Sequence, residues 1–461
     1  MNISIIGTGY VGLTLSALLA RVGHKTHCID VVPEKIETIK TGKSYFYELG
    51  LDNLVKYGID SGNLIPTLDY GEGLKDADVV FLSVGTPSGK DGGLDLTYIF
   101  DAVKKAAKYV KDGVIFVQRS TVPVGTGEKA IIIMKEANPS LKFTYLSCPE
   151  YLRESSAVLD SIIQDRIVIG GDDKKAIQKI FDIFEKIENE AEEITKETPE
   201  ISKYANSYMH SNEHKTMKFS DKCITTCLES AELVKICANS FLAMKISFAN
   251  NIARICDSVG ANVNEVMDGV GMDRRIERSF LYPGPGFGGG CFPKDVKGLK
   301  RSLEEHGIDS DLIKMIWKVN EEQVDYIVEQ VKKMNIFKGA RVGMLGLAFK
   351  PGTSDVRVSP ACRLGKALSK AGYYVRATDP QAINDAKKEF PEEKNLKYVD
   401  TVEEVFDGSE IVILATDWPE YKELDFENLS KLMSKKNFYD ARNCLDKESM
   451  SKIFKFENLG S

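Results

Sequence analysis

A short apolar run at the start of the chain ends in a glycine-rich turn, and a helical pattern begins directly after it. The run is Ile3–Ile6, the turn reads G-T-G-Y-V-G over residues 7–12, and Val11–Val22 carries the helical pattern. Glycines spaced as G-x-G-x-x-G allow a tight turn and bring the backbone close to a pyrophosphate at the helix N-terminus. This strand–turn–helix context is typical of a dinucleotide-binding unit.

A carboxylate at the end of the second apolar run supports this interpretation. Thr26–Asp30 ends 18 residues after Gly12, at a position where an acidic side chain accepts hydrogen bonds from ribose hydroxyls. Because a carboxylate at Asp30 repels a 2′-phosphate, the sequence predicts NAD rather than NADP as the cofactor. The alternative is a glycine turn that serves packing alone.

Further apolar runs alternate with amphipathic stretches along the first half of the chain. The candidate strands are Val79–Val84, Val114–Gln118, Phe143–Ser147 and Ile167–Gly170, and Tyr98–Tyr109 is a candidate helix. Near-continuous apolar strands that alternate with helices predict a buried parallel sheet with helices on both faces.

The middle of the chain predicts one long helix. Residues 229–259 contain neither Gly nor Pro, which predicts a helix on the order of 45 Å long. It is apolar around most of its girth, which suits a spacer between domains or a subunit interface. The polar segment of about 188–227 before it is expected to be an inserted loop or an irregular helical excursion.

The strand–helix alternation restarts in the last third of the chain. Its candidate elements are the strands Arg341–Leu347, Tyr373–Thr378, Ile411–Ala415 and Phe438–Asp440 and the helix Pro360–Ala371. The expected fold class is therefore α/β, with two Rossmann-like doubly wound sheets joined by a long central helix. We expect an NAD-binding domain over 1–205, a central helical domain over 228–330 and a third domain over 331–461.

Composition narrows the range of partners and compartments. With 61 basic and 68 acidic residues the net charge is −7, which disfavours non-specific binding to nucleic acid or to an anionic membrane. No apolar run is long enough for a membrane span, and the N-terminus lacks the pattern of a signal peptide. Nine scattered cysteines, an odd number, indicate reduced thiols, so we expect a cytoplasmic protein.

One of the nine cysteines stands in an unusual context. Five glycines between residues 284 and 290 precede Cys291, and Lys294 and Asp295 follow it within four residues. Glycines admit a close ligand, a neighbouring lysine favours the thiolate, and the thiolate is the nucleophile. An aspartate four residues further on could orient a water molecule. A structural cysteine is usually buried in a packed core, so a catalytic role is the better interpretation.

Other polar residues stand at the expected strand ends and on the long helix. Two loops, residues 84–87 and 120–126, carry Thr86 and Thr121 and could equally be ordinary turns. Glu150 and Glu154 could hold a water or start a helix. Lys235 and Asn239, one turn apart on an apolar helix, need partners that a ligand or a neighbouring helix could supply.

The last third also carries basic residues beside its strands. Lys350, Arg357 and Arg442 follow predicted strand ends and suit phosphate oxygens. Since V-G-M-L-G at residues 342–346 lacks the full dinucleotide motif, these residues predict a second nucleotide that is not a second NAD.

Eight motifs in a fixed order together resemble the UDP-glucose/GDP-mannose dehydrogenase family. They are G-T-G-Y-V-G, V-G-T-P, S-T-V-P-V-G-T, P-E-Y-L-R-E, A-E-L-V-K-x-x-x-N, G-F-G-G-G-C-F-P-K-D, A-F-K-P-G-T-x-D-x-R and D-A-R-N. The match spans nearly the whole chain, and the long segment 188–227 is its main departure from the family.

The resemblance implies an NAD-dependent four-electron oxidation of UDP-glucose to UDP-glucuronate through a thiohemiacetal and a thioester on Cys291. It implies that the third domain and the glycine loop hold the UDP-sugar. It also implies a homodimer or a higher homo-oligomer, in which Arg275 reaches the sugar site of the neighbouring subunit.

The resemblance, together with the glycine turn, assigns roles to individual residues. Catalytic roles are expected for Cys291, Lys235, Asp295, Thr121, Glu154 and Asn239. Contacts to NAD are expected from Gly7, Gly9, Tyr10, Val11, Gly12, Asp30, Lys35, Val84, Thr86, Thr121, Glu154, Lys294 and Arg357. Contacts to the substrate are expected from Glu150, Tyr151, Leu152, Lys235, Asn239, Arg275, Phe280, Tyr282, Gly288, Cys291, Phe349, Lys350 and Arg442.

Four alternatives remain open at this point. The substrate could be GDP-mannose or a UDP-N-acetylhexosamine, although F-P-K-D and D-A-R-N look more like the UDP-glucose branch. A two-electron hydroxy-acid dehydrogenase, or a non-catalytic nucleotide-sugar binding protein, would leave Cys291 without a role. His210, His214, Cys223 and Cys227 could bind zinc, but their order and spacing are wrong for a zinc finger, so no metal is expected.

Overall fold

The computed structural model describes residues 1–89, 92–198, 201 and 217–460 of the chain. Contacts between residues divide it into two compact units, Met1–Cys237 and Ala238–Ser461. The boundary lies inside the long helix α12 (Leu228–Val259), which confirms the predicted central helix. The three-part division of the chain stays a prediction.

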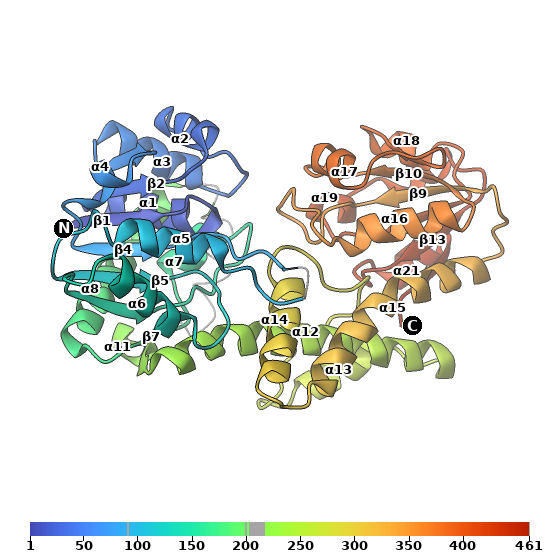
Figure 1. Cartoon of the computed structure of the whole chain (residues 1–461). Helices are drawn as coiled ribbons and strands as arrows, with labels where there is room; N and C mark the ends of the chain where they lie inside the picture. The colour runs from blue at the N-terminus through green and yellow to red at the C-terminus, as the bar shows by residue number, and fades with distance from the viewer. Residues whose placement is uncertain (90–91, 199–200, 202–216, 461) are drawn as a thin grey trace. The chain divides into compact units, whose positions relative to one another are not determined.

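The first unit is built on a sheet whose described strands follow the order β3-β2-β1-β4-β5-β6-β7-β8. Figure 1 labels β2, β1, β4, β5 and β7 of this sheet, in this order from top to bottom. The strands are β1 (Asn2–Ile6), β2 (Lys25–Ile29), β3 (Leu64–Thr67), β4 (Val79–Leu82), β5 (Val114–Gln118), β6 (Phe143–Ser147), β7 (Ile167–Gly170) and β8 (Cys223–Thr226). Apart from the start of α12, the described helices of this unit are α1 (Tyr10–Arg21), α2 (Pro33–Lys40), α3 (Leu51–Asp60), α4 (Tyr70–Leu74), α5 (Thr97–Ala106), α6 (Thr126–Ala137), α7 (Ala157–Ile162), α8 (Lys174–Asn189), α9 (Ala191–Glu197) and α11 (Phe219–Lys222).

Both faces of this sheet are buried, as its apolar strands predict. Because side chains alternate along a strand, Ile3 and Ile5 of β1 pack with α1, α3, α7 and α8 on one face. Ile6 lies in the core on the other face, with residues of α4, α5 and α6.

One pair of strands in this otherwise parallel sheet is antiparallel. β7 is antiparallel to β6, and β8 then pairs in parallel with β7. Residues 148–166 form a loop and the short helix α7. This connection stays at the end of the sheet where β6 finishes, so β7 starts there and runs in the opposite direction. β8 also corrects the expectation for residues 188–227, because the described part of this segment contains the edge strand β8 in addition to the helices α9 and α11.

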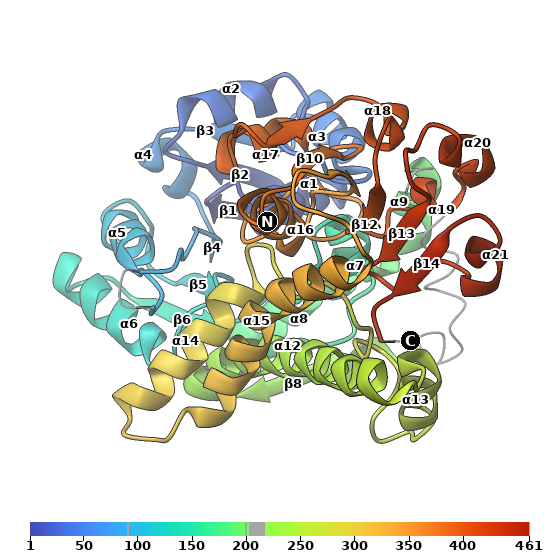
Figure 2. The same ribbon diagram turned by 90° about the vertical axis from the view of Figure 1, so that its right-hand side faces the viewer.

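The second unit contains a sheet in which every described pair of neighbouring strands is parallel. Its strands follow the order β11-β10-β9-β12-β13-β14. Figure 2 labels β10, β12, β13 and β14 of this sheet, in this order from left to right. They are β9 (Arg341–Leu345), β10 (Tyr374–Thr378), β11 (Leu396–Tyr398), β12 (Ile411–Leu414), β13 (Asn437–Asp440) and β14 (Lys455–Asn458). Its helices after α12 are α13 (Val263–Gly271), α14 (Phe292–Glu305), α15 (Asp311–Lys333), α16 (Pro360–Lys370), α17 (Ile383–Glu389), α18 (Val402–Phe406), α19 (Pro419–Lys422), α20 (Phe426–Ser430) and α21 (Lys447–Ser451).

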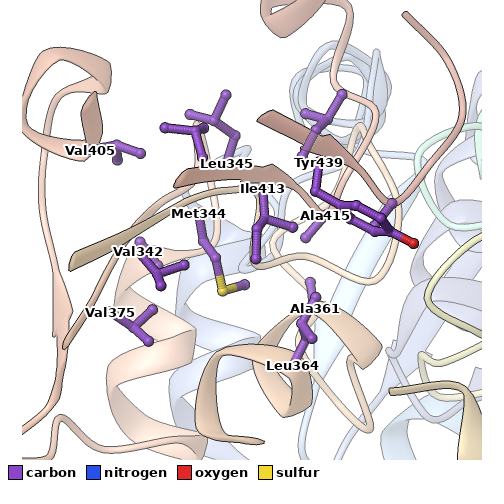
Figure 3. Packing of buried hydrophobic residues seen from close by; sticks show 14 of the residues in the cluster. Val342, Met344, Leu345, Ala361, Leu364, Val375, Val405, Ile413, Ala415 and Tyr439 are labelled. Carbon is purple, nitrogen blue, oxygen red and sulfur yellow. The ribbon is translucent and has the colours of Figure 1, made fainter. Parts of the chain in front are cut away.

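The core of this second sheet again has two faces. Figure 3 shows Met344 and Ile413 pointing toward Leu364 of α16, whereas Leu345 points to the side of Val405 in α18. In both sheets the first strand (β1 or β9) lies between the second (β2 or β10) and the fourth (β4 or β12), and the third (β3 or β11) lies at the edge. Both units therefore have a doubly wound α/β sheet. Within the described residues, no helix combines the length and the apolar character needed to cross a bilayer.

Candidate functional site

The glycine turn lies at the crossover point of the first sheet, where β1 is flanked by β2 and β4. A Cβ on Gly7, whose φ is +96°, would lie 2.6 Å from the carbonyl oxygen of Ser83, and a Cβ on Gly12 would lie 1.9 Å from that of Gly7. Both positions therefore require glycine. The N-cap residue of α1 is Gly9, which provides no side-chain cap, and an anion such as a pyrophosphate binds favourably at the N-terminus of a helix.

Asp30 lies directly beside this turn. Its carboxylate accepts hydrogen bonds from the backbone N–H and the hydroxyl of Thr8, at 3.0 and 2.6 Å, and Lys35 Nζ is 3.6 Å away. Burial alone would raise the pKa of Asp30, but the Thr8 hydrogen bonds and Lys35 hold it below its ordinary value. The group is therefore a carboxylate at neutral pH, as a ribose-binding residue must be.

Two aromatic residues beside the turn were not identified from the sequence. The Tyr45 hydroxyl donates to the Thr8 carbonyl at 2.9 Å, and its ring lies 5.0 Å from Lys35 Nζ. The Phe46 ring packs 4.1 Å from that of Tyr10. They come from the segment between α2 and α3, whose sequence shows no periodicity or motif that would have placed it here.

The loops after β4 and β5 are joined by side-chain hydrogen bonds. The Thr86 hydroxyl donates to the Thr121 carbonyl at 2.7 Å, and the Ser120 hydroxyl donates to the Val84 carbonyl at 2.7 Å. The structure thus brings together the two threonine loops predicted from sequence, although Thr86 and Thr121 meet through a side chain and a backbone group.

Lys235 of α12 is buried, with 3% of its surface exposed, and lies against the loop that follows β6. Its Nζ is 3.1 Å from Glu150 Oε1 and 5.5 Å from the centre of the Tyr151 ring. Burial raises the pKa of Glu150, but the nearby Lys235 ammonium and a 2.6 Å hydrogen bond from the Leu152 N–H hold it below its ordinary value. The Lys235 ammonium therefore pairs with Glu150 inside the first unit and does not extend to solvent.

Two further residues that contact the loop after β6 were not predicted from the sequence. Arg119 is buried and donates to the carbonyl groups of Cys148 and Pro149, at 3.0 and 3.3 Å. The buried Glu48 carboxylate accepts the N–H groups of Ser155 and Ala157, both at 2.8 Å, and so holds the segment that contains the partly buried Glu154. Neither residue belongs to a motif; only distant contacts in the fold reveal them.

In the second unit, Cys291 is the N-cap residue of α14, again without a side-chain cap. One turn further on, Asp295 is fully buried and accepts hydrogen bonds from Asn239 Nδ2 at 2.5 Å and from Lys294 Nζ at 2.6 Å. The macrodipole of α14 favours negative charge at its N-terminus, where the thiol stands. A cysteine and a fixed carboxylate one helical turn apart suit acyl transfer to water, in which the thiolate form of the cysteine is the nucleophile.

The glycines before Cys291 fit closely against the loop that follows β9. A Cβ on Gly289 would lie 2.7 Å from the Phe349 ring, and a Cβ on Gly290 would lie 2.6 Å from the Arg357 guanidinium. The Gly289 N–H also donates to the Arg357 carbonyl at 2.8 Å. The structure therefore places Phe349 and Arg357 at the glycine loop. The Arg357 side chain also forms a 2.7 Å ion pair with Asp355.

Arg442 lies at the end of β13, next to the same glycine loop. A Cβ on Gly284 would be 3.0 Å from its Nη1, and its guanidinium pairs with Asp417 at 2.6 Å. The ammonium of Lys350 lies 5.7 Å from the Phe349 ring centre. Lys350 and Arg442 each follow a strand of the second sheet, where the sequence predicts a phosphate-bearing ligand.

Asp379 follows β10, the counterpart in the second sheet of Asp30 in the first. Its carboxylate already accepts five hydrogen bonds, from the N–H groups of Leu347, Ala348, Gln381 and Ala382 and from the Trp418 indole. A carboxylate offers about four lone pairs, so none is left for a ribose hydroxyl. This saturation supports the prediction that the second sheet does not bind a second NAD.

Three predicted substrate residues precede the glycine loop in the chain. The Arg275 side chain is 83% exposed and pairs with Asp273 at 2.6 Å. Phe280 has a left-handed backbone with φ of 65°, and its ring packs 6.2 Å from that of Phe292. Tyr282 is exposed, and Arg278 lies 4.2 Å from its ring centre.

The predicted alternative of a zinc site falls partly outside the described residues, because His210 and His214 are not among them. Cys223 lies in β8 and its thiol donates to the Phe219 carbonyl, while the Cys227 thiol is within 3.2 Å of the Ser230 hydroxyl. Among the residues that the structure describes, no three His, Cys, Asp or Glu side chains are grouped as a metal site would require.

Three family models match the chain in consecutive sections. They are described as the NAD binding, central and UDP binding domains of the UDP-glucose/GDP-mannose dehydrogenase family, and they match residues 1–188, 229–322 and 343–447. By these descriptions, the first section binds NAD and the last binds UDP.

Individual proteins match over the full length. A UDP-glucose 6-dehydrogenase of Rickettsia felis is 36% identical over 100% of this chain and 96% of its own, and UDP-glucose 6-dehydrogenase TuaD of Bacillus subtilis is 37% identical over 97% and 90%. A solved UDP-glucose dehydrogenase from Pyrobaculum islandicum is 32% identical, with a TM-score of 0.85 over 99% of this chain and 97% of the other. The chain therefore belongs to the UDP-glucose/GDP-mannose dehydrogenase family.

Proposed function

We propose that this protein is a UDP-glucose 6-dehydrogenase that converts UDP-glucose to UDP-glucuronate in two NAD-dependent oxidations. The observation that carries the proposal is the position of Cys291 at the N-terminus of α14, one turn before the buried Asp295. A two-electron dehydrogenase or a binding protein has no use for this pair. The curated relatives named UDP-glucose 6-dehydrogenase support the choice of substrate.

The overall reaction consumes one UDP-glucose, two NAD⁺ and one water, and it yields one UDP-glucuronate, two NADH and three protons. When bound, NAD⁺ accepts a hydride from carbon 6 of the sugar at each of the two oxidations. Between them, the Cys291 thiolate adds to the aldehyde and forms a C–S bond. Loss of the second hydride leaves a thioester, and water then breaks the C–S bond and releases the carboxylate and the thiol.

The charged residues divide the remaining work. Lys235 stabilises the negative charge that develops on the sugar oxygen, and Glu150 keeps its ammonium in place through the 3.1 Å ion pair. Asp295, fixed by Asn239 and Lys294, accepts a proton from the attacking water. Thr121 and Glu154 assist from the loops after β5 and β6.

Binding of the two nucleotides follows the division between the two sheets. The glycine turn, Asp30 and Lys35 hold the NAD diphosphate and ribose. The residues predicted at the second sheet and the glycine loop, among them Lys350 and Arg442, hold the UDP of the substrate.

The test is the number of NADH molecules formed per sugar nucleotide consumed. Purified protein is given NAD and, in separate reactions, limiting UDP-glucose, GDP-mannose or a UDP-N-acetylhexosamine, and NADH is followed at 340 nm. We expect two NADH per UDP-glucose and a clearly higher kcat/KM for this sugar than for the others.

Each other outcome points to a particular alternative. One NADH per sugar would contradict the thioester route, because a single oxidation stops at the aldehyde. Preference for GDP-mannose or a UDP-N-acetylhexosamine would reassign the substrate within the family. Binding of UDP-sugar without NADH would favour a non-catalytic protein.

We also propose that two copies of the chain associate along α12. This helix carries an exposed apolar stripe of Leu233, Phe241, Phe248, Ile255 and Val259, with 49% of Phe248 and 57% of Phe241 exposed. The stripe extends over about 39 Å at 1.5 Å per residue, a long exposed apolar surface for a helix of a monomer. A second copy would cover it isologously.

Phe248→Glu is therefore expected to convert a dimer into a monomer, because the carboxylate would have to be buried between two helices. Light scattering coupled to gel filtration measures the mass. Ile132→Glu, at an exposed apolar position of α6, is the matched control and should leave the mass unchanged. A monomeric parent protein, or a dimeric Phe248→Glu variant, would contradict the proposed interface.

The cysteines support a reducing compartment such as the cytoplasm. All nine lie in the part of the chain that the structure describes, and none forms a disulfide there.

A further inference from the structure

We propose that three buried amide side chains, Asn250, Asn320 and Gln323, position the loop that carries Cys291 and thereby set the geometry of the nucleophile. We call these three residues the amide clamp. Asn250 comes from α12, and the other two come from α15. The inference rests on the proposed function, in which Cys291 is the nucleophile.

Asn320 holds both backbone groups of one loop residue. Its Oδ1 accepts the Phe287 N–H at 2.7 Å, and its Nδ2 donates to the Phe287 carbonyl at 3.2 Å. A Cβ on Gly286 would lie 2.6 Å from Asn320 Oδ1, so the loop can approach the amide only because residue 286 is glycine.

Asn250 and Gln323 hold Gly284 in the same way, one group each. Asn250 Oδ1 accepts the Gly284 N–H at 2.8 Å, and Gln323 Nε2 donates to the Gly284 carbonyl at 3.0 Å. Arg254 fixes the orientation of the Gln323 amide, because its Nε and Nη2 donate to Gln323 Oε1 at 3.1 and 3.0 Å. All three clamp residues are buried, with at most 1% of their surface exposed.

These four hydrogen bonds act on a segment that has little order of its own. Glycine loses more conformational freedom on folding than any other residue, and five glycines occupy the seven residues before Cys291. Hydrogen bonds buried away from water hold such a segment far better than exposed ones, because breaking one leaves a buried polar group without a partner.

Aromatic packing connects the loop residue that Asn320 holds to the helix that begins after Cys291. The Phe287 ring lies 6.2 Å from that of Phe292, the first residue of α14, and 6.1 Å from that of Trp317 in α15. Since Cys291 directly precedes Phe292, a shift of Phe287 would move the N-terminus of α14 and with it the thiol. The clamp residues are thus positioning residues that act through the loop.

The test compares Asn250→Ala with Asn251→Ala, two adjacent asparagines of α12 of which the second is exposed. Asn320→Asp is a second clamp variant that keeps the acceptor for the Phe287 N–H and loses the donor to its carbonyl. Hydrogen exchange of the peptides that cover residues 282–290, read by mass spectrometry, reports loop order without substrate or cofactor. Steady-state kinetics then give kcat and both KM values.

We expect at least tenfold faster exchange of the loop amides in Asn250→Ala and Asn320→Asp, with exchange in β9–β14 unchanged. We expect kcat to fall at least tenfold while the KM for NAD stays within twofold, because NAD binds to the first unit. Asn251→Ala should match the parent protein in both measurements.

Unchanged loop exchange in both folded clamp variants would overturn the proposal. So would a kcat loss that Asn251→Ala shares, or one that comes with faster exchange throughout the second unit, since either indicates general destabilisation. If the parent protein forms no NADH from any sugar nucleotide, the proposed function fails, whereas the exchange comparison still decides whether the amides hold the loop.

Discussion

Cys291→Ser is expected to lower the formation of UDP-glucuronate by roughly 10³-fold or more. A serine hydroxyl is a far poorer nucleophile than a thiolate near neutral pH, so the aldehyde would not be captured for the second oxidation. The first oxidation does not need the sulfur, and slow formation of one NADH per sugar can persist. Product and NADH are both measured, so the two oxidations are separated.

A matched control and a direct observation accompany this prediction. Cys227→Ser changes an exposed cysteine of the first unit and should retain the activity of the parent protein. Mass spectrometry of parent protein quenched during turnover should find a sugar-nucleotide adduct on the peptide that contains Cys291. Full turnover in Cys291→Ser would refute the covalent route.

Lys235→Met is expected to reduce both catalysis and stability. Loss of a placed cation against developing oxyanion charge lowers kcat by about 10²–10³-fold. Removing one partner of the buried pair leaves Glu150 without its counter-ion, and breaking such a pair costs about 3–5 kcal/mol in the free energy of unfolding. Denaturant titration and steady-state kinetics measure the two effects separately.

The stability effect should depend on pH with a definite sign. In the parent protein the pKa of Glu150 is lowered, so its stabilising contribution is present above the pKa of the unfolded chain and is lost as the pH falls through the folded value. In Lys235→Met, burial without the ammonium raises the pKa of Glu150. The buried carboxylate then lowers the free energy of unfolding of this variant at any pH above the pKa of Glu150 in the unfolded chain. The difference in the free energy of unfolding between the parent protein and Lys235→Met should therefore decrease as the pH falls from 7 toward about 4.

The double variant Lys235→Met/Glu150→Gln distinguishes the two roles of the lysine. It removes both buried charges, so most of the lost stability should return while kcat remains low. Recovery of kcat in the double variant would contradict the catalytic role of Lys235. A gap in stability that does not change with pH would contradict the charge pairing.

The sequence predicts the elements of the fold where apolar runs are long enough to be buried on both sides. β5, β6 and β7 have the predicted bounds, and α12 differs from prediction by one residue. The edge strands β3, β8, β11 and β14 were not predicted, because a short strand paired on one side needs little apolar character. The reversal at β7 depends on the path of residues 148–166, which no local pattern encodes.

The candidate site was predicted to the extent that its residues form contiguous motifs. The glycine turn with Asp30 and the Cys291 segment with Asp295 have signatures that can be read locally, and their geometry fits the expected chemistry. Arg119, Glu48 and the amide clamp could not be found this way, because each acts on a backbone group more than 25 residues away. The roles of the individual site residues stay predictions.

A practical consequence follows from where the two compact units divide. The boundary between Cys237 and Ala238 lies inside a continuous helix, so no exposed linker marks it. Proteases cut preferentially at mobile loops, and a helical bond is protected as long as the helix is folded. Limited proteolysis is therefore not a route to separate halves, and a gene fragment that ends at the boundary would encode an unpaired half-helix with a new, frayed end.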